Sequence, residues 1–112
     1  MHFCLTATYT AQSLNAMREN PNTNRREAAS NLIEAAGGKL INFFYTGVNG
    51  PGALVVFDVP DPEMATALVG VTAASGSLTD IRMTRLYTQD EINPIRQKAR
   101  QLREAYKPPG EA

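Results

Sequence analysis

The sequence predicts an α+β sandwich, in which two helices cover one face of a four-stranded antiparallel sheet. Two strand-like runs, residues 39–46 and 53–59, are joined by a segment with three glycines and a proline, which predicts a β-hairpin. A strand and an amphipathic helical pattern precede this hairpin, and a further helix and strand follow it. The order β-α-β-β-α-β is that of the ferredoxin-like fold. We expect one domain, because 112 residues suffice for a single core.

The N-terminal third predicts one strand and two helices. Residues 2–9 alternate between apolar and polar side chains, as in a strand with one buried face. Thr10 is suited to cap a short helix, which should end before Pro21, because proline disfavours a helical conformation in the preceding residue. Asn24 predicts the start of a second helix, and Gly37-Gly38 its end. The expected buried side of this helix consists of Ala28, Ala29, Leu32, Ile33, Ala35 and Ala36.

The C-terminal half predicts a helix, a strand and a basic helix. Asp61 is a favoured cap, and Pro62 fits the first helical position, where a missing N–H costs nothing. The expected buried stripe of this helix is Met64, Ala67, Leu68 and Val71. Residues 78–87 alternate and predict the fourth strand. Thr88 and Glu91 then form a capping-box pattern that starts the last helix.

One face of the predicted sheet has no helices to cover it. The third strand nevertheless places large apolar side chains on both faces, through Leu54, Val55, Val56 and Phe57. At about 25 cal/mol per Å² of apolar surface, leaving half of these side chains in water would forfeit several kcal/mol. We therefore expect a homo-oligomer, a dimer or larger, in which this face packs on the sheet of a second copy about 10 Å away.

The second strand contributes an alternation of its own to the two faces. Its pattern predicts Leu40, Asn42 and Phe44 on one side and Phe43 and Tyr45 on the other.

The last helix has a narrow apolar stripe, formed by Ile95, Ala99, Leu102 and Tyr106, and a basic remainder. Two placements fit this stripe: docking on a neighbouring subunit, or folding back over the sheet edge of the same chain. We therefore divide the chain into a domain of residues 1–91 and a C-terminal helical arm and tail of residues 92–112.

Composition excludes several classes of function. Eleven basic and eleven acidic side chains cancel, so no overall field draws the protein to nucleic acid or to a membrane. No apolar run approaches the about 18 residues of a membrane span. The single cysteine, Cys4, cannot form an internal disulfide and fits a reducing cytoplasm, which is the expected location. One histidine, one cysteine and scattered carboxylates give no metal-ligand spacing, and we expect neither a metal nor a cofactor.

The polar side of the first strand predicts a ligand site. His2, Cys4, Thr6 and Thr8 share this side, and the topology should bring Arg82 of the fourth strand beside them. Arginine suits a carboxylate or enolate, and histidine can move a proton near neutral pH. A histidine so close to a terminus is also commonly incidental, and a lone strand cysteine is commonly a small apolar residue. The candidate ligand-binding residues are Arg82, His2, Thr6, Asn42 and Tyr45.

Several segments resemble the GYD-domain family. They are Tyr9-Thr10, Glu27-Ala28-Ala29, Glu34-Ala35-Ala36-Gly37-Gly38-Lys39-Leu40, Phe44-Tyr45-Thr46-Gly47, Val55-Val56-Phe57-Asp58-Val59-Pro60-Asp61 and Gly76-Ser77-Leu78 to Arg82. The resemblance runs from about Phe3 to Glu91. It implies the dimeric α+β-barrel group, whose members include cofactor-free monooxygenases, muconolactone-type isomerases and stress-responsive barrel proteins. The GYD family has no settled activity, so the resemblance implies a fold and an assembly and leaves the reaction open.

The chain departs from that family at its signature. The Gly-Tyr-Asp motif falls on Gly50-Pro51-Gly52, so the tyrosine hydroxyl and the aspartate carboxylate are absent. If those two side chains carry a family function, this chain has lost it or moved it elsewhere.

Three functions remain open. The first is a small-molecule-binding protein, for which the resemblance implies cofactor-independent isomerase or monooxygenase chemistry. The alternative is a non-catalytic assembly or regulatory module that recruits partners through its C-terminal arm. RNA binding by the sheet and the basic arm is the third, although no strand has the aromatic pattern of RNA-recognition domains.

Overall fold

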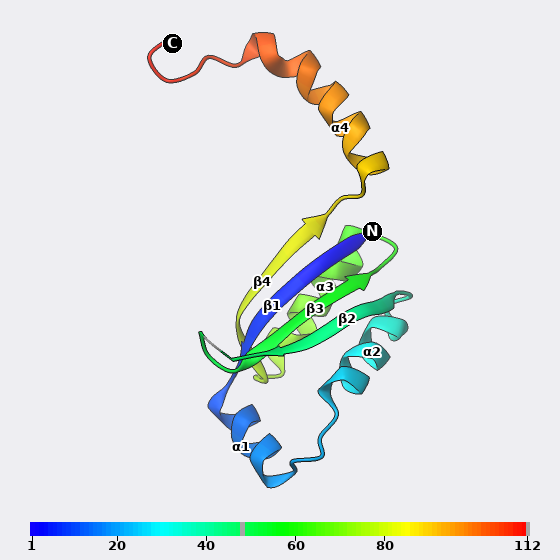
Figure 1. The fold of residues 1–112 in the computed structure, drawn as a ribbon, viewed down its shortest axis with the longest axis vertical. Coiled ribbons are helices and arrows are strands. Elements are labelled where there is room, and N and C mark those ends of the chain that lie inside the picture. Colours follow the sequence, from blue (N-terminus) through cyan, green and yellow to red (C-terminus); the bar gives the residue numbers. More distant parts are fainter. Residues whose placement is uncertain (48, 112) are drawn as a thin grey trace.

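The computed structural model describes residues 1–47 and 49–111 and has the predicted ferredoxin-like architecture (Figure 1). Val48 of the predicted turn and Ala112 of the tail lie outside the described residues. The strands are β1 His2–Tyr9, β2 Lys39–Thr46, β3 Gly52–Asp58 and β4 Leu78–Leu86. The helices are α1 Ala11–Glu19, α2 Arg25–Ala35, α3 Pro62–Ala74, α4 Gln89–Leu102 and the short 3₁₀ helix η1 Arg103–Ala105. The sheet is antiparallel in the order β2-β3-β1-β4, so the predicted fold class is confirmed.

The core lies on one face of this sheet. Along β1, Phe3, Leu5, Ala7 and Tyr9 are buried, whereas the residues between them are only half-buried. α2 packs on β2 and α3 packs on β4, and α3 lies behind the sheet in the view of Figure 1. The opposite face, which we call the open face, is not covered by any helix of the described chain.

Three of the predicted faces are corrected by the structure. Ala35 of α2 is exposed, and α3 buries Ala65 and Leu68 while Met64, Ala67 and Val71 are exposed. α3 is apolar almost all round, so its pattern does not single out one side, and the most buried residue is Ala65, which is 0% exposed. In β2, a β-bulge between Leu40 and Asn42 puts Leu40 on the core side, opposite Phe57, instead of beside Asn42.

The segment Gly50-Pro51-Gly52, on which the resemblance places the Gly-Tyr-Asp signature, has little room for side chains. Gly50 has a φ of +106°, and the carbonyl of Pro51 accepts a hydrogen bond from the backbone N–H of Tyr9 at 2.9 Å. A Cβ on Gly52 would lie 2.0 Å from the backbone oxygen of Ala7. This backbone therefore excludes any side chain at position 52.

We expect Gly52→Ala to lower the free energy of unfolding by about 1–3 kcal/mol, because the β1–β3 pairing must shift to relieve the clash. Gly47→Ala is the matched control in the same connection, since a Cβ there meets nothing within 4 Å, and it should stay within about 0.5 kcal/mol of the wild type. Urea denaturation measures both changes. Equal midpoints for the two variants would show that Gly52 is not a close contact.

The C-terminal arm projects away from the body of the protein (Figure 1). Within the described chain, no residue of α4 is buried. The radius of gyration is 18.0 Å, whereas a compact domain of about 100 residues has about 13 Å. The arm is therefore not folded over the sheet edge of its own chain, which was one of its two predicted placements.

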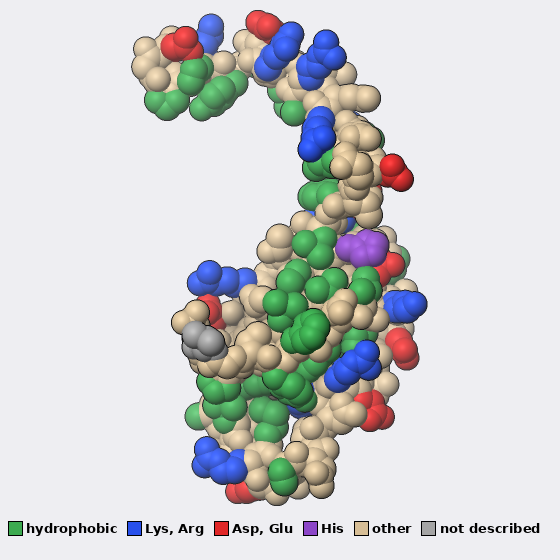
Figure 2. All heavy atoms as spheres, viewed as in Figure 1, with side chains coloured by type: hydrophobic (Ala, Val, Ile, Leu, Met, Phe, Trp, Pro, Cys, Tyr) green, Lys and Arg blue, Asp and Glu red, His purple; other side chains and the backbone are tan. Residues whose placement is uncertain are grey.

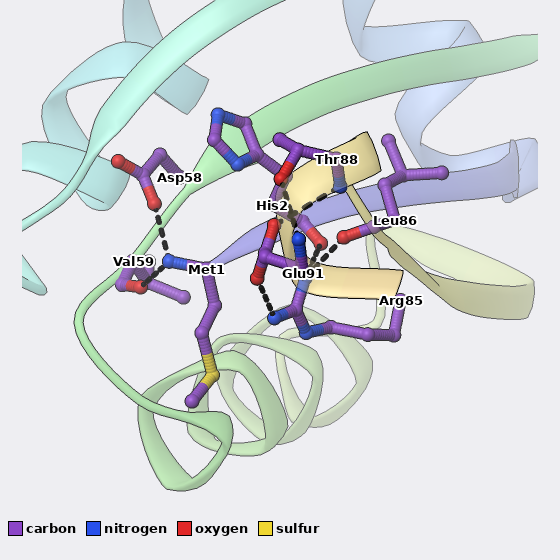
Figure 3. A network of polar contacts seen from close by, with 8 residues as sticks. All are labelled: Met1, His2, Asp58, Val59, Arg85, Leu86, Thr88 and Glu91. Atoms are coloured by element: carbon purple, nitrogen blue, oxygen red, sulfur yellow. Dashed lines mark hydrogen bonds and ion pairs between the residues drawn. The ribbon is translucent and has the colours of Figure 1, made fainter. Parts of the chain in front are cut away.

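A polar network fixes the first turn of α4 to the ends of β1 and β4 (Figure 3). The guanidinium of Arg85 donates to the Glu91 carboxylate at 2.6 Å and to the backbone oxygens of His2 and Leu86. It also lies 4.5 Å from the centroid of the Tyr87 ring. The hydroxyl of Thr88 accepts from the backbone N–H of Glu91, whose carboxylate accepts from that of Thr88, so the predicted capping box is confirmed.

The pKa of Glu91 provides a test of this network. The hydrogen bond from Arg85, followed by that from Thr88, lowers the pKa of Glu91 to about 2. A carboxyl whose pKa is lowered by folding contributes stability above its ordinary pKa, and this is lost as the pH falls through about 2. An NMR titration should give a Glu91 midpoint near 2, returning toward the ordinary glutamate value in Arg85→Met. An ordinary midpoint in the wild type would contradict the network.

Candidate functional site

Four of the five predicted site residues lie on the open face, but they are not all neighbours there. Arg82 pairs with Thr6 across the β1–β4 ladder, as predicted from the topology. Asn42 is two strands away from β1, opposite Val56. His2 lies at the far end of β1, opposite Asp58 and Leu86, and is labelled in Figure 3. The open face thus brings Thr6 and Arg82 together and leaves His2 and Asn42 apart from them.

Thr6 and Arg82 line a shallow hollow of about 510 Å³ at one end of the open face. The polar part of the remaining lining includes Thr8, Asn49 and Asp80. The side chains of Arg82 and Asp80 form an ion pair at 3.6 Å, and both are largely exposed. Because Asp80 offsets the charge of Arg82 and water solvates both, this hollow is a weak site for an anion.

Tyr45 lies on the opposite side of the sheet from the other four residues. It pairs with Ala53, whose side chain belongs to the core, and its ring meets the edge of Phe43 with centroids 5.1 Å apart. Its hydroxyl accepts a hydrogen bond from the backbone N–H of Arg25 at 3.3 Å. Tyr45 therefore belongs to a second group of polar residues, at the start of α2.

An apolar cavity of about 100 Å³ lies between the sheet and the two helices α2 and α3. It exists because the two helices pack on opposite edge strands and leave space over the two central strands. Leu5, Val55 and Phe57 form part of its floor. Ala28 and Leu32 of α2 and Leu68 of α3 form part of its walls.

A second hollow, of about 210 Å³, adjoins this cavity near α1. Met17 of α1 lines it, and the Ser13 hydroxyl fixes α1 in place by donating to the backbone oxygen of Ser77 at 2.9 Å. Tyr9 and Arg25 line both spaces. These two residues therefore stand at the junction between the apolar cavity and the more polar hollow.

Tyr9 and Arg25 give this junction its chemistry. Tyr9 is 6% exposed, and this burial raises the pKa of its phenol. The nearby positive charge of Arg25 lowers the pKa and so offsets part of the rise. The hydroxyl therefore remains a hydrogen-bond donor at neutral pH. Arg25 is half-buried, and in residues 1–47 and 49–111 none of the ion pairs involves it. A half-buried cation without a carboxylate partner, beside an apolar cavity, suits an anionic ligand.

Sequence reasoning did not single out either residue as part of a site. The alternation of residues 2–9 predicted only that Tyr9 belongs to the buried side of the first strand. The segment that contains Arg25 predicted only the start of a helix. The available signal was the position of Tyr9 at the end of an inward-facing apolar row, because the hydroxyl of a buried tyrosine needs a polar neighbour.

Spectrophotometric titration of the phenols tests this junction. We expect one of the four tyrosines to ionise above the ordinary value of 10 and to be missing from the titration of Tyr9→Phe. In Arg25→Met the pKa of Tyr9 should rise further, because the positive charge that lowers it has been removed. A lower pKa in that variant would show that Arg25 does not face the hydroxyl.

Comparison with known proteins adds a family. A sequence model of the GYD domain matches residues 3–95, from β1 into α4. The predicted resemblance is thereby confirmed, and the match continues slightly past Glu91. No curated protein matches the chain. In the described part of the chain, no helix combines the length and the apolar character needed to cross a membrane.

Proposed function

The chain belongs to the GYD-domain family, and we propose that it is a small-molecule-binding protein whose ligand lies between the sheet and the helices α2 and α3. The observation that carries this proposal is the pair Tyr9 and Arg25 at the mouth of the apolar cavity. A few polar groups at the edge of an apolar pocket are the common design of a small-ligand site. The apolar part of the ligand would fill the cavity, and its anionic group would face Arg25.

The volumes limit the size of this ligand. The cavity and the adjoining hollow measure about 100 and 210 Å³, so even together they only reach the lower limit of sites for drug-sized ligands, about 300 Å³. An apolar cavity of about 150 Å³ can hold a benzene ring. The ligand class is therefore a compact carboxylate, phenolate or enolate with about one ring or a short branched chain.

The same groups suit the chemistry that the family resemblance implies. Isomerisation through an enolate and oxygenation of a phenolate both place negative charge on a substrate oxygen, which a guanidinium and a phenol donor stabilise. Among the described residues that line the two spaces, none is a carboxylate or a histidine that would remove the proton. The proposal is accordingly a binding function, and isomerase or monooxygenase activity would need a base from the substrate or from outside these two spaces.

Binding of 4-fluorobenzoate, followed by ¹⁹F NMR, tests the proposal with a probe of the right size and charge. We expect the wild type to bind it more tightly than the neutral 4-fluorobenzyl alcohol. Arg25→Met should weaken benzoate binding about ten- to hundredfold, which corresponds to the loss of one charge-assisted hydrogen bond. Arg26→Met is the matched control, because Arg26 is the exposed neighbour of Arg25 and lines neither space.

Two further variants locate the binding site. Ala28→Phe places a ring in the inner cavity and should abolish binding, whereas Arg82→Met alters only the open-face hollow and should leave the affinity unchanged. Loss of binding in Arg82→Met with full binding in Arg25→Met would move the site to the open face. Equal binding by all variants would contradict both sites.

A second candidate function is assembly, and two exposed surfaces favour it. On the open face, Phe44 is exposed and its neighbours Leu54 and Val56 are half-buried, and Figure 2 shows hydrophobic side chains gathered over the middle of this face. The apolar stripe of α4, which includes Ile95, Ala99 and Leu102, is not covered by any other part of the described chain. We propose that the open face packs on that of a second copy and that α4 makes a separate contact between copies.

A further inference from the structure

We propose that α4 of one copy docks along the outer side of α3 of a second copy. This inference rests on the assembly function proposed above and is independent of the ligand cavity. Two rows of apolar side chains carry it. The arm seam is Ile95, Ala99, Leu102 and Tyr106, and the α3 seam is Met64, Ala67, Val71 and Ala74.

The arm seam has the form of a helix-pairing surface. Within α4, Ile95, Ala99 and Leu102 follow each other at intervals of four and three, which gives a narrow row instead of the broad stripe that packs on a sheet. Tyr106, which the sequence placed on the same helical stripe, lies beyond the end of α4 and of η1, in extended backbone. Ile95, Leu102 and Tyr106 are 41%, 67% and 68% exposed. Exposed Ile95 and Leu102 in one helical row, with exposed Tyr106 just beyond it, indicate a surface that is covered in the assembled protein.

The α3 seam matches it in spacing and length. Its intervals are three, four and three, and Val71 at its centre is 57% exposed. α3 has 13 residues and α4 has 14, so both are about 20 Å long. Beside the seam lies Gly70, where an added Cβ would meet nothing within 4 Å. A glycine inside a helix costs about 1 kcal/mol relative to alanine, and it permits the close approach of another backbone.

The distribution of charge favours docking of the arm on α3 of a second copy instead of pairing between two arms. Between residues 92 and 107 the arm has five basic side chains and one acidic side chain, and Arg96, Lys98 and Arg103 flank its seam. Two arms that paired with each other would therefore bring like charges together. α3 has no basic residue, and Asp61 and Glu63 lie at its start. The α3 seam can thus accept the basic flanks without repulsion.

The way the base of the arm is held favours contact with α3 of a second copy instead of α3 of the same chain. The 2.6 Å ion pair of Arg85 with Glu91 and the Thr88 capping box hold the first turn of α4 against the ends of β1 and β4. From that turn α4 runs away from the sheet, whereas α3 lies behind it (Figure 1). The arm seam therefore cannot reach the α3 seam of its own copy unless this network breaks.

A disulfide trap tests the contact directly, in a Cys4→Ser background. A protein with Val71→Cys is mixed with one that has Ala99→Cys, and mild oxidation should give a mixed disulfide, which requires Cα atoms within about 7 Å. Both positions lie near the centre of their seams, so either direction of crossing allows the bond. Gln97→Cys, on the other side of α4, is the matched control. No mixed disulfide, or equal yields with the control, would overturn the contact.

Native mass spectrometry of substituted full-length chains separates this contact from assembly in general. Leu102→Asp and Val71→Asp should both lose the same larger species, whereas the controls Gln97→Asp and Ala73→Asp should keep it. Leu102 and Val71 are outside the core, so circular dichroism should show all four variants folded. A monomeric wild type would overturn the assembly function itself. A larger species that survives Val71→Asp would overturn the α3 contact alone.

Discussion

β1 and β3 pair at the centre of the sheet, and only two helices are available to bury their inward side chains. Those helices pack on the outer strands, α2 on β2 and α3 on β4, so they stand apart over the middle of the sheet. Space remains between them, lined by Leu5, Val55 and Phe57. The same shortage of helices leaves the opposite face of the sheet uncovered, although the apolar side chains of Leu54 and Val56 lie on that face. The cavity and the open face therefore have one origin, the ratio of helices to strands.

The chemistry of the cavity depends on how α2 begins. Asn24 caps the helix by accepting from the backbone N–H of Glu27 at 3.0 Å, and the Tyr45 hydroxyl accepts from that of Arg25. The first bond starts the helix, and the second holds its first turn against β2. The Arg25 side chain consequently lies next to the buried hydroxyl of Tyr9. Ordinary capping thus places a cation at the edge of an apolar space.

The features that could be predicted are those that depend on neighbours in sequence. Caps at Thr10, Asn24, Asp61 and Thr88 were predicted and confirmed, and the strand boundaries agree within one residue. The predicted buried side of α3 was right for Leu68 and wrong for Met64, Ala67 and Val71, because a helix that is apolar all round gives no preferred direction. The junction of Tyr9 and Arg25 could not be predicted, since it depends on where α2 packs, and Tyr45 was grouped with residues of the other face. Arg82 and Thr6 did meet as predicted, because strand register alone brings them together.

α3 connects the two proposed functions through its two sides. Leu68 and Thr72 line the apolar cavity, whereas Met64 and Val71 are exposed. In a single copy, α3 is held mainly by its contacts with β4. An arm docked on the outer side would add a second layer of packing and restrict the movement of the cavity wall. Since a site that is already ordered loses less entropy when a ligand binds, assembly through α4 would favour ligand binding without contributing a residue to the cavity.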